Sequence, residues 1–580
     1  MTVRHRLPTG WFLLLGTAIA LAACSPAATA QPARGVAPAG TETVHLKSRL
    51  TVAVSKPVVA FGYIGQTTGV GSVVTYAPLI SAGLAAGDAT GLPVPWLAQE
   101  RPSLEQGTMA VLPDGRMTTR WTVRPNATWH DGTPITADDF AFSYTVEADP
   151  EIPVSDRSAI QQMESVQAID AHSFLITWKH PYFLADSLGG PLLWALPAHI
   201  LEQPYTTLAK TAFLNLPYWT SELVQSGPFR VAQYQPGAAT VLVAHEGYFL
   251  GRPKIDEVII REILDSNAVF ASILAGDVDM TIELLDAAQG QTLREQWGSA
   301  GTVIAKNGGP QYLAHQFAPE IVQQPALLDI RARQAMYLAM DRPAMAEIAW
   351  GGRRVPEGEA TSLLQPADPL FPYVKDVSSG STSDPQRAIR MLAELGWVRG
   401  ADGRLADAAG HPFTLDVRAT RPDLGQAAVR MLQDIGVDAS LTVPPPAASG
   451  DRQYLQSYSG MEIGGSGEGD RIFDRLNIAT TPIASNGYAG QNRGHYASTQ
   501  MTDLIGRYRA SLTTESRGES MRGIAETVAQ DLPIMMLYFI PVWATLGQSV
   551  HALDDMNGGL TGGPPFSPYT RSAHLWSKDT

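Results

Sequence analysis

Residues able to carry out covalent or metal chemistry are few and scattered in this sequence. Its 12 histidines never form HExxH or another compact ligand pair, and there is only one cysteine, so spacing predicts no zinc site. The adjacent acids Asp138 with Asp139, and Asp554 with Asp555, project to different sides of a regular element and make no hydrolytic pair by spacing. The glycine run 464–469 contains neither a nucleophile elbow nor a phosphate-binding loop. We expect no cofactor, no metal and no catalytic residue, although tertiary contacts could assemble a carboxylate pair in a secreted hydrolase.

The single cysteine lies at the end of a possible export signal. Two arginines precede an apolar run, Trp11–Leu21, which leads into the sequence Leu-Ala-Ala-Cys ending at Cys24. This ending resembles the lipobox of bacterial lipoproteins, in which the cysteine is acylated; the alternative is an ordinary signal peptide with a chance cysteine. We expect a signal peptide at 1–23, Cys24 as lipid anchor and a flexible Pro/Ala/Gly-rich tether at 24–46. The protein would then be exported and held at the cell membrane, on its extracellular face or in a periplasm.

The composition predicts a large folded body. The chain has 580 residues, of which 44% are hydrophobic and 17% are charged, and these values exclude disorder for most of it. Its formal net charge of −14 argues against nucleic-acid binding. The length is several times that of a usual domain, so more than one lobe is expected.

Local patterns predict alternating strands and helices. The run Leu50–Val54 is typical of a strand, and Thr136 with Asp139 has the spacing of a helix capping box. Asp329 and Asp384 are each placed to begin a further helix.

A strand, a helix and a second strand follow one another closely between residues 413 and 443. The first strand is Phe413–Val417, the helix carries apolar residues from Leu424 to Ile435, and the second strand surrounds Leu441. This order is a βαβ crossover, which requires at least one parallel strand pair. The sequence therefore predicts a mixed α/β fold.

An ordered set of motifs resembles one protein family. The run Trp129–Phe140 reads WHDGTPITADDF, and the later segments of the same kind are Pro197–Leu201, Ser226–Arg230, Gly276–Asp279, Asp329–Ala335 and Asp384–Trp397. Together they resemble the extracellular solute-binding proteins that feed peptide/nickel-type ABC transporters. The first motif is expected to be structural, with Asp131 and Gly132 in a turn.

The resemblance implies an α/β, two-lobed periplasmic-binding-protein-like fold (type II, cluster C) with an extra inserted domain. The implied segments are, in chain order, lobe I at 47–90, a small inserted domain at 91–194, lobe I again at 195–306, lobe II at 307–533 and lobe I at 534–580. The chain would cross between the lobes near Ala305–Pro310 and Asp531–Ile534. Such a protein is a monomeric receptor, not an enzyme, and its partners are a ligand held between the lobes and the permease subunits of an ABC transporter.

The resemblance also suggests which residues contact the ligand. In peptide-binding members, a carboxylate of the central lobe pairs with the ligand's α-amino group. The corresponding stretch, Met461–Asn477, offers Glu468 and Asp470 but lacks the Trp and Pro usual there. Both acids are candidates for ligand binding, and the alternative is that they are solvated acids of a glycine loop.

A later loop and the N-terminal lobe supply further candidates. Tyr488, Arg493 and Tyr496 cluster in a glycine-rich loop, where the arginine could pair with a carboxylate and the tyrosines could form apolar walls. The alternative is a plain surface loop. Phe61 and Tyr63 would add aromatic contacts from lobe I. An oligopeptide is the expected ligand, with an oligosaccharide, a metal chelate or a signalling role as alternatives.

Overall fold

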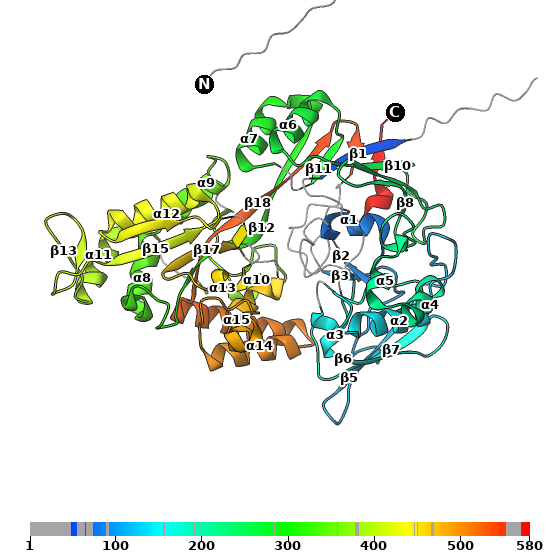
Figure 1. Cartoon of the computed structure of the whole chain (residues 1–580), viewed down its shortest axis with the longest axis horizontal. Helices are drawn as coiled ribbons and strands as arrows, with labels where there is room; N and C mark the ends of the chain where they lie inside the picture. The colour runs from blue at the N-terminus through cyan, green and yellow to red at the C-terminus, as the bar shows by residue number, and fades with distance from the viewer. Residues whose placement is uncertain are drawn as a thin grey trace, which may run out of the picture. The chain divides into compact units, whose positions relative to one another are not determined.

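A ten-stranded mixed sheet forms the framework of the protein (Figure 1). The computed structural model describes residues 48–54, 64, 73–88, 92–154, 157–189, 192–282, 285–355, 358–377, 382–445, 447–448, 451–465, 469–552 and 570–579. In spatial order the strands are β16 (Asp438–Thr442), β15 (Thr414–Ala419), β17 (Met461–Gly465), β12 (Gly301–His315), β18 (Ile534–Gly547), β11 (Met280–Ile282), β1 (Arg49–Val54), β10 (Glu257–Glu262), β9 (Ala239–Ala244) and β8 (Phe229–Gln235).

Two long strands hold this sheet together. β12 and β18 pair antiparallel from Gly301 opposite Gly547 to Ala314 opposite Ile534, and Figure 1 shows them running side by side. β11 pairs with one end of β18, whereas β17 pairs with the opposite end of β12. We call β11, β1, β10, β9 and β8 the first half-sheet, and β17, β15 and β16 the second half-sheet.

Between the half-sheets the described part of the sheet narrows to two strands. This waist comprises Ala305–Pro310 of β12 and Phe539–Trp543 of β18, and its register shifts between Asn307 and Pro310. A proline lacks the N–H needed for a ladder hydrogen bond, so Pro310 and Pro541 account for the irregular pairing. The predicted segment boundary at 306/307 falls inside the waist, whereas the one at 533/534 falls at the start of β18, before the waist.

A second, four-stranded antiparallel sheet lies within the stretch predicted as an inserted domain. Its order is β4 (Met109–Val111), β5 (Met117–Thr122), β7 (Ser173–Trp178) and β6 (Met163–Ala168). Helix α2 (Ala137–Ala148) packs on β6 and β7, and α3 (Ser158–Gln162) packs beside them. Buried Trp121, Trp129 and Trp178 belong to one hydrophobic core here, separate from that of the first half-sheet.

Helices cover both half-sheets. The helices on the side of the first half-sheet are α1 (Val73–Ile80), α4 (Ala198–Thr207), α5 (Lys210–Leu214), α6 (Ser266–Ala275) and α7 (Ala287–Gln296). Those of the second half-sheet are α8 (Ile330–Ala339), α9 (Arg342–Ala349), α10 (Phe371–Val374), α11 (Pro385–Glu394), α12 (Pro422–Asp434), α13 (Arg452–Leu455), α14 (Thr499–Ala510) and α15 (Thr514–Asp531). Among these, α12 packs on β15 and β16, α11 on α8, and α14 on α15.

The remaining elements are short. They are the strand pairs β2 (Ala85–Gly87) with β3 (Pro93–Pro95), β13 (Val398–Arg399) with β14 (Leu405–Ala406) and β19 (Val550–His551) with β20 (Ser577–Lys578), and the 3-10 turns η1 (Pro217–Trp219), η2 (Gly298–Ala300), η3 (Pro325–Leu328), η6 (Gly469–Arg475), η7 (Ile478–Thr480), η8 (Ala484–Asn486) and η9 (Ala573–Leu575). In the described ranges, no helix combines the length and the apolar character that crossing a bilayer requires.

Several local predictions are confirmed. The side chains of Asp329 and Asp384 accept hydrogen bonds from the first turns of α8 and α11, each at 2.8 Å. Asp139 accepts the backbone N–H of Thr136 at 2.8 Å, which completes the predicted cap of α2. The predicted crossover is β15, α12 and β16, whose strands pair parallel with Thr414 opposite Asp438. The mixed α/β fold class is therefore correct.

Candidate ligand-binding site

The loop that carries Arg493 is fixed to the second half-sheet by a buried amide. Asn492 is completely buried and donates hydrogen bonds to the carbonyl oxygens of Asn477 at 3.2 Å and Tyr496 at 2.8 Å, while accepting the N–H of Tyr496 at 3.0 Å. The buried Gln316 amide, just after β12, donates to the Arg493 carbonyl at 3.4 Å. These bonds hold the backbone of Arg493 against the end of β12.

The Arg493 guanidinium lies among charged neighbours of the second half-sheet. Burial, and after it the positive charge of Arg475, lowers its pKa, and Glu462 acts in the opposite direction. Its side chain is only partly exposed. Across the described residues it makes no hydrogen bond or ion pair. A partly buried cation therefore remains without an anionic partner.

Glu462, whose charge acts on Arg493, is already engaged by another arginine. Arg418 is 2% exposed and its Nε and Nη2 lie 3.0 and 2.7 Å from the same oxygen of Glu462. Arg418 also donates to the Tyr454 carbonyl at 2.9 Å, and its guanidinium lies 5.0 Å from the centre of the Tyr458 ring. Since β15 and β17 are parallel neighbours, this pair joins two central strands of the second half-sheet.

An aromatic side chain of β12 completes this charged cluster. Tyr312 is fully buried, and the Arg475 guanidinium lies 5.5 Å from its ring centre. Burial raises the pKa of Tyr312 to about 12, so its hydroxyl is neutral and can donate or accept a hydrogen bond. We call Arg418, Glu462, Arg475, Arg493 and Tyr312 the arginine cluster.

The residues predicted to bind ligand lie in different environments. Tyr496 is buried and its hydroxyl donates to Asp531, so it holds the loop on α15. Tyr488 is partly exposed and has a positive φ of 56°, in the same loop as Arg493. Asp470 lies in η6, but its side chain is outside the described parts. Cys24, Phe61, Tyr63 and Glu468 also lie outside the described residues.

Four residues of the arginine cluster were missed by the sequence reasoning: Arg418, Glu462, Arg475 and Tyr312. One signal was available, because Arg418 directly follows the predicted strand Phe413–Val417 and lies within β15, and a charge in a buried strand needs a partner. The partner, Glu462, is 44 residues away along the chain. No spacing rule connects two residues that meet only through parallel strand pairing.

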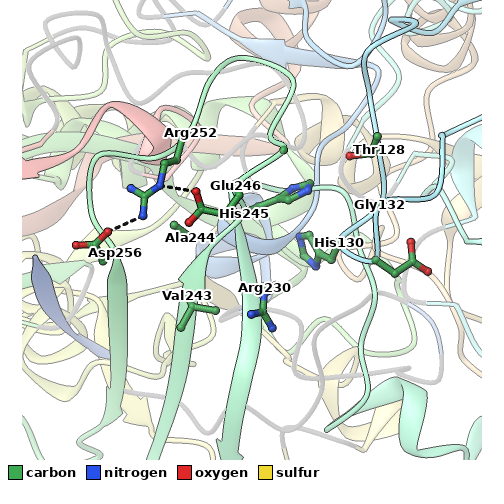
Figure 2. A pocket seen from close by; sticks show the side chains of 12 residues that line it. Thr128, His130, Gly132, Arg230, Val243, Ala244, His245, Glu246, Arg252 and Asp256 are labelled. Carbon is green, nitrogen blue, oxygen red and sulfur yellow. Dashed lines mark hydrogen bonds and ion pairs between the residues drawn. The ribbon is translucent and has the colours of Figure 1, made fainter. Parts of the chain in front are cut away.

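A separate pocket of about 490 Å³ lies where the first motif meets the first half-sheet (Figure 2). It is lined by Thr128, His130, Asp131, Gly132, Arg230, Val243, Ala244, His245, Glu246, Gly247, Arg252 and Asp256. Arg252 pairs with Glu246 at 2.7 Å and with Asp256 at 2.6 Å, which ties the loop after β9 to the start of β10. Figure 2 shows the rings of His130 and His245 close together, and they meet edge to face with their centres 5.0 Å apart.

Hydrogen bonds assign the protons of both pocket histidines. The backbone N–H of Gln225 donates to Nδ1 of His130 at 3.2 Å, so Nε2 of His130 carries the proton and donates to the Gly227 carbonyl at 3.1 Å. His245 donates through Nδ1 to the same carbonyl at 3.2 Å. Burial lowers the pKa of His130 to about 3 and also lowers that of His245, so both rings are neutral near pH 7. These bonds join the motif loop to the segment that leads into β8, which supports the expected structural role of the motif.

In the part of the chain that the structure describes, no group of three His, Cys, Asp or Glu side chains is placed to hold a metal ion. Two half-sheets joined by a two-stranded waist form a two-lobed, periplasmic-binding-protein-like fold. The family model for bacterial extracellular solute-binding proteins, family 5, matches residues 93–476. The chain therefore belongs to the family 5 extracellular solute-binding proteins, a family of binding proteins rather than enzymes.

Similar proteins agree with this assignment. The oligopeptide-binding protein AppA of Bacillus subtilis is 25% identical over 442 residues, which are 73% of this chain and 76% of AppA. An oligopeptide-binding protein of Thermus thermophilus, solved with a pentapeptide, superposes with a TM-score of 0.68 at 22% identity, covering 91% of this chain and 96% of the other. NikA of Brucella suis, solved with Fe(III)-EDTA, gives a TM-score of 0.72 at 15% identity, covering 92% and 100%. The structural likenesses establish the fold.

Proposed function

We propose that this protein is the substrate-binding component of an ABC importer, and that it captures an extracellular oligopeptide and delivers it to the permease. The observation that carries the proposal is family membership, supported by similarity over most of the chain to an oligopeptide-binding protein. In this proposal the segments 47–90, 195–306 and 534–580 form lobe I, 307–533 forms lobe II, and 91–194 is an inserted domain. The ligand is bound between the lobes without being chemically changed, by a monomeric receptor.

Direct binding and uptake together test this function. Calorimetry with an equimolar pool of tri- to pentapeptides should give saturable heat, and deletion of the gene in the native host should abolish uptake of a labelled peptide from the pool. A plasmid copy should restore that uptake. Hydrolysis of the peptides by the purified protein would contradict the receptor function and support a hydrolase.

The proposed receptor is attached to the membrane through Cys24. A diacylglycerol with a further acyl chain supplies the two hydrophobic signals that stable anchoring requires. Cys24→Ala should move the protein from the membrane fraction to the soluble fraction, whereas the neighbouring Ser25→Ala should not. Fractionation of the native host with an antibody measures both. Wild-type protein found wholly in the soluble fraction would contradict the anchor.

The ligand's α-amino group is proposed to pair with Glu468 or Asp470. Replacing the pairing acid by its amide should weaken peptide binding by about 2–5 kcal/mol, the usual effect of breaking a buried charge pair. Peptides acetylated at the N-terminus should bind the wild-type protein more weakly by the same free energy. Unchanged affinity for the acetylated peptides would remove α-amino recognition.

A further inference from the structure

We propose that Arg493 determines specificity by binding a carboxylate of the captured solute, so that the solute carries at least one free carboxylate. This inference rests on the proposed function, because it assigns a chemical class to the solute of the same receptor. It comes from the position, partners and burial of the Arg493 side chain.

The first argument is that the backbone of Arg493 is held in place before any ligand binds. Its loop is anchored by the buried Asn492 side chain and by the Gln316 amide. The next residue, Gly494, accepts the N–H of Phe317 at 2.8 Å, and a Cβ on this glycine would lie 2.5 Å from the His315 carbonyl oxygen. The backbone thus packs directly on the chain leaving β12. Because the backbone is already fixed, only the side chain of Arg493 loses conformational entropy on binding.

The second argument is that the charge of Arg493 is uncompensated. Removing a guanidinium from water is unfavourable unless an anion and hydrogen bonds replace the water. The carboxylate of Glu462 opposes the lowering of the Arg493 pKa by burial, but its hydrogen bonds at 3.0 and 2.7 Å are both with Arg418. The positive charges of Arg475 and Arg418 also act on Arg493. The local field therefore favours an incoming anion.

The third argument excludes the common structural role of a buried arginine. Arg333, Arg342, Arg418 and Arg475 each lie over an aromatic ring, at 4.8 to 5.5 Å. Within the described ranges, Arg493 has neither such a ring contact nor a hydrogen bond from its side chain to a carbonyl. All five guanidinium donors of Arg493 are therefore without an acceptor among the described residues.

The chemistry of the guanidinium indicates the ligand group. Its planar pair of N–H donors matches the two oxygens of a carboxylate, an arrangement that the single ammonium of lysine cannot reproduce. A peptide would offer its C-terminal carboxylate or an acidic side chain, and a small polycarboxylate would offer the same group. The shared chemistry is the free carboxylate.

The experiment compares three probes on four proteins by calorimetry. The probes are a pool of tri- to pentapeptides with free C-termini and no acidic side chains, the same pool with C-terminal amides, and citrate. The proteins are wild type, Arg493→Gln, Arg493→Lys and Arg390→Gln. Arg390 is an exposed arginine of α11 with no described partner, so its variant controls for the loss of one charge.

The expected result is that wild type binds the free-acid pool roughly 10- to 100-fold more tightly than the amidated pool, the range for a hydrogen bond to a charged group. Arg493→Gln should abolish this difference, Arg493→Lys should restore little of it, and Arg390→Gln should behave as wild type. Urea unfolding midpoints close to wild type would show that the variants are folded. If an Arg493 variant does not fold, the comparison of the free-acid and amidated pools on wild type still tests whether the protein recognises a free carboxylate.

Other outcomes separate this inference from the proposed function. Equal binding of the two peptide pools would overturn the role of Arg493 while leaving the peptide receptor intact. Binding of citrate alone, lost in Arg493→Gln, would contradict the peptide function and support carboxylate recognition. Binding of none of the three probes by wild type would contradict both.

Discussion

At the scale of single residues, His130 makes the stability of this protein sensitive to acid. Its ring lies partly buried between the motif loop and the segment that precedes β8, with His245, Arg230 and Asp131 as its charged or titratable neighbours. Burial lowers its pKa from 6.5 to about 3. The folded state therefore favours neutral His130, and this contribution to stability is complete above the unfolded pKa and is lost as the pH falls toward the folded one.

We expect this loss to appear between about pH 6.5 and pH 3. For one such histidine the free energy of unfolding should decrease by about 1.4 kcal/mol per pH unit in that window. Urea unfolding of wild type and His130→Gln at pH 7, 6, 5 and 4 measures the difference, and the variant should show the shallower pH dependence. His180→Gln, at an exposed position, is the control. Parallel pH profiles for wild type and His130→Gln would contradict this origin of acid sensitivity.

Glu462 has a structural effect that can be separated from ligand binding. The variant Glu462→Gln leaves Arg418, 2% exposed, without the carboxylate that holds two of its nitrogens. Breaking a buried ion pair on one side should reduce the free energy of unfolding by about 3–5 kcal/mol. Urea unfolding without ligand measures the change, with Glu519→Gln on the exposed surface of α15 as control. Equal unfolding midpoints for Glu462→Gln and wild type would show that the pair contributes little.

At the scale of secondary structure, the packing of α7 on the waist is tight. An added Cβ at Gly290 would lie 2.5 Å from two carbons of the Trp543 ring. Because both sites are buried, Gly290→Ala should reduce the free energy of unfolding by about 1–3 kcal/mol through overpacking.

A second helical glycine provides the matched comparison. At Gly506 in α14, no heavy atom lies within 4 Å of the added Cβ, so Gly506→Ala should stabilise the protein by about 0.4–1 kcal/mol. If local packing is decisive, thermal or urea unfolding should show changes of opposite sign in the free energy of unfolding of the two variants. Stabilisation by both substitutions would show that helix propensity alone controls the result, and destabilisation by both would contradict the gain expected at Gly506.

These elements also show what local sequence can and cannot predict. Caps at Asp329 and Asp384 were predictable because a side chain and the N–H that it accepts are only two or three residues apart. The full length of β12 was not, because Gly308, Gly309 and Pro310 resemble a turn in the sequence. Pairing with β18, more than two hundred residues later, overrides that local preference. Arg493 was identified by its residue type, whereas its neighbours depended on the sheet order.

At the scale of the whole molecule, the waist is the place where the two half-sheets could move relative to each other. Only β12 and β18 pair there in the described sheet, and the register shift interrupts their ladder. Bending two strands disturbs fewer hydrogen bonds than bending a wider sheet. Gly308 also allows a close approach, since a Cβ there would lie 2.7 Å from a side-chain carbon of Val542. A hinge at this position would let lobe closure occur without rearranging either core.

The last prediction is that ligand makes the protein more compact. A solute that contacts both lobes binds the closed state more tightly, and it can shift the equilibrium only by that difference in affinity. Small-angle scattering should give a smaller radius of gyration with the bound tri- to pentapeptide pool than without it. At the same subsaturating concentration, the amidated pool should give a smaller change if Arg493 has its proposed role. Mass spectrometry of the same samples should recover intact peptides. A bound pool that leaves the radius of gyration unchanged would contradict hinge closure at the waist, and peptides found cleaved would identify a hydrolase instead.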